Sequence, residues 1–113
     1  MNSKNKIILI GNGPSALDHK FGKVIDSYGT VVRFSWFHID GYEDCVGSKT
    51  DVWFTTVADA KRMEKSYKQI FEHSWEWNKK KDKTYKKLKE NYPALEITKV
   101  KRKTLEEMQE FVG

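Results

Sequence analysis

Short apolar runs separated by polar, glycine-containing turns recur along the chain. Residues 6–10 form an apolar run that Gly11 closes, which predicts a strand buried on both faces. The β-branched run 30–34 predicts a second strand, and the segments 50–56 and 94–100 predict a third and a fourth.

Helical signals lie between these runs. Pro14 suits a first helical turn, so a short helix is expected after it. Thr56 and Asp59 resemble a capping box that opens a helix near Val57, whose buried stripe would be Met63, Tyr67, Ile70, Phe71 and Trp75.

Two later segments also carry helical signals. One predicted helix spans 83–91 and ends before Pro93. Thr104 and Glu107 form a second capping box, which predicts a last helix over 105–111. Strands that alternate with helices indicate an α/β fold, a Rossmann-like three-layer α/β/α arrangement with a mainly parallel sheet of four strands.

Length and composition limit the chain to one domain, residues 1–113, with a single core. No apolar run approaches the roughly 18 residues of a membrane span, and the N-terminus lacks the apolar core of a signal peptide. The single cysteine, Cys45, fits a reducing compartment. We therefore expect a cytoplasmic protein with no membrane partner.

The net charge of +5 comes mostly from the lysine-rich segment 78–90. Acidic residues and a helical period are mixed into that segment, which is typical of a solvated helix face. A basic patch can bind nucleic acid, but no nucleic-acid-binding motif accompanies this one, so no nucleic-acid partner is expected.

The turn "GNGPSA" follows the first predicted strand. A strand, a glycine-rich turn and a helix start together form an arrangement that receives phosphate. The turn also fits the relaxed fingerprint of flavin and nicotinamide dinucleotide folds, which remain an alternative. Against it, the second strand ends with Arg33, where a dinucleotide site needs an acidic side chain for the ribose.

Several motifs in order resemble one enzyme family. "IILIGNGPS" resembles the opening of bacterial sialyltransferases. The stretch from "GKVIDSYGTVVRF" through "GYEDCVGSKTDVWF" resembles the large sialyl motif of animal-type sialyltransferases, and the likeness covers roughly residues 7–56. The resemblance implies a glycosyltransferase that binds a CMP-sugar donor, normally CMP-sialic acid, and a glycan acceptor, without a metal or another cofactor.

The resemblance also implies which residues bind the donor. Asn12 would hydrogen-bond the phosphate or the ribose, while the glycines let the backbone approach the ligand. Ser35 stands where these families usually carry a second nucleotide-contacting Asn. The implied donor site consists of Gly11, Asn12, Gly13, Ser15, Arg33 and Ser35.

Some residues allow two interpretations. Arg33 could face the ligand, or it could pair with Asp26 or Asp51. The turn "VGSKTD" (46–51) shapes the entry to the third strand or touches the ligand, and His38 lies in the long loop near the predicted site.

In these families the catalytic base is normally a histidine in a downstream motif, and this sequence holds no such segment. Its catalytic residues are therefore unassigned, and the sequence is interpreted as the donor-binding half of an enzyme. The alternatives are a nucleotide-binding module without catalysis, and a chain completed by another chain or by a homodimer through an exposed sheet edge.

Overall fold

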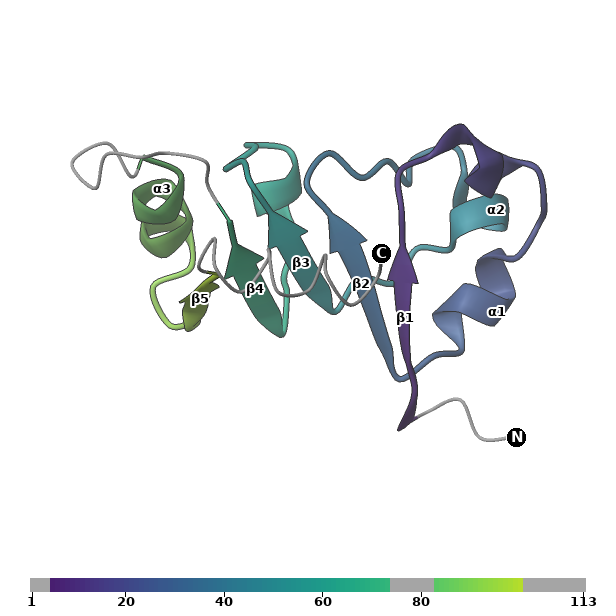
Figure 1. The fold of residues 1–113 in the computed structure, drawn as a ribbon, viewed down its shortest axis with the longest axis horizontal. Coiled ribbons are helices and arrows are strands. Elements are labelled where there is room, and N and C mark those ends of the chain that lie inside the picture. The colour runs from purple at the N-terminus through teal and green to yellow at the C-terminus, as the bar shows by residue number, and fades with distance from the viewer. Residues whose placement is uncertain (1–4, 74–82, 101–113) are drawn as a thin grey trace, which may run out of the picture.

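The chain folds around one parallel sheet. The computed structural model describes residues 5–73 and 83–100. Figure 1 shows the strands side by side in the order β1-β2-β3-β4-β5. The strands are β1 (Ile7–Ile10), β2 (Thr30–Phe34), β3 (Val52–Thr55), β4 (Gln69–Glu72) and β5 (Ile97–Lys99).

Short helical elements connect the strands. The helices are α1 (Gly22–Asp26), α2 (Glu43–Val46) and α3 (Lys83–Asn91), and two 3₁₀ turns are η2 (Pro14–Leu17) and η3 (Arg62–Glu64). In Figure 1, α1 and α2 lie at the β1 end of the sheet and α3 lies at the β5 end. The predicted α/β class with a parallel sheet is confirmed, with five strands in place of four.

The additional strand replaces the helix predicted from Val57. The hydroxyl of Thr55, not Thr56, accepts the amide N–H of Val57 at 2.9 Å, and the chain turns through η3 into β4. Ile70 and Phe71 pair in parallel register with Trp53 and Phe54 of β3. The helical spacing of the apolar residues therefore arose from two different elements, and the prediction of one helix here was wrong.

The main core lies on the face of the sheet that carries Trp53. Register places Ile70 and Ile97 beside it on the same face, and all three side chains are buried. Leu88 of α3 and Val46 of α2 pack into the same cluster, so both helices cover this face. α3 has the bounds that the sequence predicted.

The opposite face carries an aromatic row. Phe34, Phe54 and Phe71 are register partners, with ring centroids 5.7 and 6.1 Å apart along the row. Ile7 and Leu9 continue this face onto β1, where their side chains are 65% and 64% exposed. Among the described strands, β1 and β5 are the edges of the sheet. Trp75 and the predicted helix over 105–111 lie outside the described residues.

Asp51 ties two strands together at the start of β3. Its Oδ2 accepts the Val31 amide N–H at 2.8 Å, and the ammonium groups of Lys49 and Lys68 lie 3.4 Å from its carboxylate. Burial alone raises the pKa of Asp51, but the amide and the two cations outweigh it and hold that pKa below its ordinary value.

We expect Asp51→Asn to lower the free energy of unfolding by about 1–2 kcal/mol at pH 7, because the amide loses both ion pairs in a buried place. Since the folded-state pKa is depressed, this stabilisation is present above the unfolded pKa of about 3.9 and is lost as the pH falls through the folded value. Urea unfolding of both proteins from pH 7 to pH 3 tests it. A difference that stays constant down to pH 3 would contradict this assignment.

Candidate donor-binding site

A cavity of about 270 Å³ opens where β1 and β2 end. Parallel strands place their carboxyl ends at one edge of the sheet, so the turn after β1 and the loop after β2 meet there. The walls consist of residues from both segments and from η2 and α2: Ile10, Gly11, Asn12, Gly13, Pro14, Ala16, Leu17, Arg33, Trp36, Phe37, His38, Tyr42 and Val46.

The glycine turn forms one wall of this cavity. A side chain at Gly11 would meet no heavy atom within 4 Å, so the space beside its backbone is open to a ligand. The Asn12 carboxamide donates from Nδ2 to the Phe34 carbonyl at 2.8 Å, which fixes the turn against the end of β2. The helix predicted after Pro14 is the four-residue 3₁₀ turn η2. A helix dipole therefore contributes little here, and the asparagine and the nearby guanidinium are the stronger polar groups.

Arg33 forms the floor between the two strand ends and is 1% exposed. Its Nε donates to the Lys49 carbonyl at 3.0 Å and to the Thr50 hydroxyl at 2.9 Å. Its Nη2 donates to the carbonyls of Val46 and Lys49 at 2.9 and 2.8 Å. The guanidinium thus holds the loop between α2 and β3 with neutral acceptors while it also lines the cavity.

Neither carboxylate considered as a partner pairs with Arg33. In the described residues, the ion pairs of Asp51 are with lysines. Burial lowers the pKa of Arg33, and the negative charge of Asp26 opposes that effect from a distance. A buried guanidinium at the cavity wall without a carboxylate in contact is a favourable place for an anion.

Asp26 holds the predicted turn over 46–51 from the other side. Its Oδ1 accepts the amide N–H groups of Ser48 and Lys49 at 3.0 and 2.9 Å. Gly47 has a φ of +73°, and a Cβ there would lie 2.4 Å from Asp26 Oδ1, so only glycine fits. These contacts favour the structural interpretation of the turn, although Val46 reaches the cavity.

Two predicted donor residues do not line this cavity. Ser15 lies on the exposed side of η2. The Ser35 hydroxyl accepts the Thr56 amide N–H at 3.1 Å and lies 3.3 Å from the Thr56 hydroxyl. Ser35 has a φ of +30°, a region where Asn is enriched several-fold among residues with a side chain, which gives a conformational reason for an Asn at this position.

Two aromatic residues of the cavity, Trp36 and Tyr42, were not predicted from the sequence, and His38 was placed only near the predicted site. Trp36 and Tyr42 line it, and His38 lies with its ring centroid 5.9 Å from that of Tyr42. Their positions depend on how the loop after β2 folds back over the sheet. The aromatic residues gathered in that loop were the signal in the sequence that could have identified this wall of the cavity.

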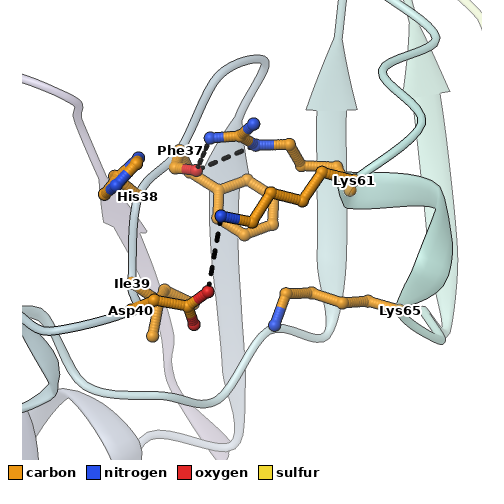
Figure 2. Close-up of a pocket in the computed structure, with 7 residues that line it drawn as sticks. Phe37, His38, Ile39, Asp40, Lys61 and Lys65 are labelled. Carbon is orange, nitrogen blue, oxygen red and sulfur yellow. Dashed lines mark hydrogen bonds and ion pairs between the residues drawn. The ribbon is translucent and has the colours of Figure 1, made fainter.

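A second, smaller cavity adjoins the first behind Phe37. Figure 2 shows Lys61 paired with Asp40. The Lys61 ammonium lies 3.5 Å from the Asp40 carboxylate, and the Arg62 guanidinium donates to the Phe37 carbonyl. Its volume is about 20 Å³, which suits a water molecule and no larger ligand. This region braces the loop after β2 against η3.

Neither a metal centre nor a membrane span appears in the part of the chain that the structure describes. Over residues 5–73 and 83–100, no three His, Cys, Asp or Glu side chains gather in a metal-binding group. No helix in the same residues has the length and apolar character needed to cross a bilayer.

The chain matches glycosyltransferase family 29 (sialyltransferase) over residues 2–111. It belongs to this sialyltransferase family. A relative, sialyltransferase-like protein 2 of Arabidopsis thaliana, is 39% identical over 57 residues, which cover 50% of this chain and 13% of the relative.

The family match confirms the predicted resemblance and places the glycine turn and Arg33 inside the matched sialyltransferase region. The matched segment of this chain covers only about an eighth of the Arabidopsis relative, 13% of its length. A nucleotide-sugar donor and a glycan acceptor stay predictions for this chain. Which atoms contact the donor stays a prediction from the geometry above.

We expect Arg33→Lys to lower the free energy of unfolding by about 2–4 kcal/mol, because one ammonium cannot reproduce the planar set of contacts to the loop before β3. Urea denaturation measures the change. Lys23→Ala, which removes an exposed cation from α1, is the control and should change stability by less than about 0.5 kcal/mol. If Arg33→Lys behaves like the control, the guanidinium does not hold the loop.

Proposed function

We propose that this chain is the donor-binding part of a sialyltransferase and that it binds a CMP-sugar in the cavity beyond β1 and β2. Membership of the family supports a nucleotide-sugar donor. The cavity, at about 270 Å³, has room for the phosphate and one ring of such a donor, and its aromatic walls offer flat surfaces to a base or a sugar.

One observation carries the proposal. Gly11, Asn12 and Gly13 from the end of β1 and Arg33 from the end of β2 line the same cavity, although about 20 residues separate them. The open backbone admits an anion closely, and the buried guanidinium supplies positive charge that no described carboxylate neutralises by contact. A single phosphate that links cytidine to a sugar matches this combination.

The order of the strands argues against the dinucleotide alternative. In the usual dinucleotide-binding sheet, β1 lies in the centre, with β2 on one side and β4 on the other. Here β1 has β2 as its described neighbour, and β4 lies beyond β3. The acidic residue that would accept the ribose hydroxyls is also replaced by Arg33, whose guanidinium has no acceptor atom.

Transfer of the sugar is the second part of the proposal. The acceptor hydroxyl needs a base, and the leaving phosphate needs donors for its growing charge. Arg33 and Asn12 are candidates for the phosphate side. The base is unassigned, and self-association through the β1 edge also stays a prediction.

CMP should raise the unfolding temperature of the full chain, with a stabilisation of about 2.7 kcal/mol at a hundredfold excess over the dissociation constant. FAD and NADP should give smaller shifts at equal concentration. Thermal unfolding with each nucleotide measures the difference. Selective stabilisation by a dinucleotide, with none by CMP, would refute the CMP-sugar assignment.

Asn12→Ala should weaken CMP binding about tenfold, the value of one hydrogen bond to a charged group, because the carboxamide both fixes the turn and faces the cavity. Isothermal titration calorimetry measures the dissociation constant directly, so a small loss of stability does not disturb the result. Ser15→Ala, in the same turn but outside the cavity wall, is the matched control and should bind CMP as the unchanged chain does. Equal binding by all three proteins would disprove the site.

A further inference from the structure

Trp36 lines two cavities. One is the donor cavity, and the other, of about 320 Å³, lies between the turn after β3, residues 57–60, and the first turn of α3. The Trp36 side chain is 56% exposed, although tryptophan is buried on average in folded proteins. A large exposed aromatic ring between two cavities is suited to contact a ligand in each.

The backbone around Trp36 is fixed in a strained conformation. Ser35, directly before it, has a φ of +30°, and the Ser35 carbonyl accepts the indole N–H of Trp53 at 3.1 Å. Arg62 donates from Nη2 to the Trp36 carbonyl at 3.2 Å, and its guanidinium carbon lies 5.8 Å from the centre of the Trp36 ring. The bonds to Trp53 and Arg62 therefore fix the backbone on both sides of Trp36.

The larger of these two cavities, of about 320 Å³, has basic side chains at its rim. Lys83 and Lys87 line it from α3, four residues apart and therefore on one face of that helix. Within residues 5–73 and 83–100, no carboxylate forms an ion pair with either lysine. The two cations are thus available to an anionic ligand.

Asp59, the one carboxylate among the described residues of this cavity wall, is already engaged. Asp59 accepts hydrogen bonds at Oδ2 from the Arg62 amide and from Arg62 Nη1, at 3.1 and 3.0 Å. The hydrogen bond from the Arg62 side chain lowers the pKa of Asp59, and the backbone amides and the charge of Arg62 lower it further. Burial acts in the opposite direction without outweighing them, so the pKa lies below its ordinary value. Asp59 therefore stays ionised and paired, which makes it a poor base and leaves the lysines as the accessible charges.

We propose that the larger cavity, beside Lys83 and Lys87, is the acceptor subsite and that it binds an anionic glycan, a sugar that carries a carboxylate. The apolar face of a sugar ring would stack on Trp36, and the carboxylate would lie between Lys83 and Lys87. The inference rests on the proposed function, because it takes the cavity on the other side of Trp36 to hold the donor. The shared wall would place an acceptor hydroxyl beside the donor sugar.

The test uses the full chain and two glycans, sialyllactose and its neutral counterpart lactose, by isothermal titration calorimetry at 50 and 300 mM NaCl without nucleotide. Sialyllactose should bind at least about tenfold more tightly than lactose, and less tightly at the higher salt concentration. Lys83→Ser/Lys87→Ser should remove that preference and leave the CMP dissociation constant within about twofold. Trp36→Ala should weaken both glycans, and its folding is checked by thermal unfolding.

Lys23→Ser/Lys86→Ser is the matched control, since it removes two exposed cations from α1 and α3 that do not line the cavity. Equal binding of the two glycans, or the same loss in the control as in the cavity variant, would overturn the inference. CMP binding distinguishes the two proposals. If sialyllactose binds through Lys83 and Lys87 but CMP does not bind, the donor assignment fails while the glycan site stands.

Discussion

The buried guanidinium of Arg33 is the contact on which the rest of the site depends. It bonds to the carbonyls of Val46 and Lys49 and to the Thr50 hydroxyl, so it joins the end of β2 to the loop that leads into β3. Taking a cation out of water is costly unless its donors are satisfied. The cost is offset here by several short hydrogen bonds, and the same group then lines the cavity as a fixed positive charge.

The parallel sheet brings the loops that line the two large cavities to one edge. Because all strands point the same way, the segments after β1, β2 and β3 emerge at one edge of the sheet. The glycine turn, the loop with Trp36 and the turn at 57–60 are therefore neighbours, and both large cavities lie among them. The buried Trp53 of β3 supports the loop after β2, since its indole N–H donates to the Ser35 carbonyl.

The sequence predicted the elements whose signals are local. β2 and α3 have the predicted bounds, because a β-branched run and a proline-terminated helix are read from neighbouring residues. The helix predicted from Val57 was wrong, because Tyr67 lies in a loop and Ile70 in β4. Both side chains contact Trp53 of β3, which is distant from them in the sequence. The motif likewise predicted Gly11, Asn12, Gly13 and Arg33 at one site, whereas Trp36 and Tyr42 entered the cavity through the fold of a loop that no local pattern specifies.

Ser35 combines a motif position with an unusual backbone conformation. The family motif led us to expect a nucleotide contact there, yet the hydroxyl is engaged by Thr56 and the residue adopts a φ of +30°. An Asn tolerates that conformation well, while Ser holds it at a cost that the bonds to Thr56 and Trp53 offset. These bonds fix the backbone directly before Trp36, the residue that lines both cavities.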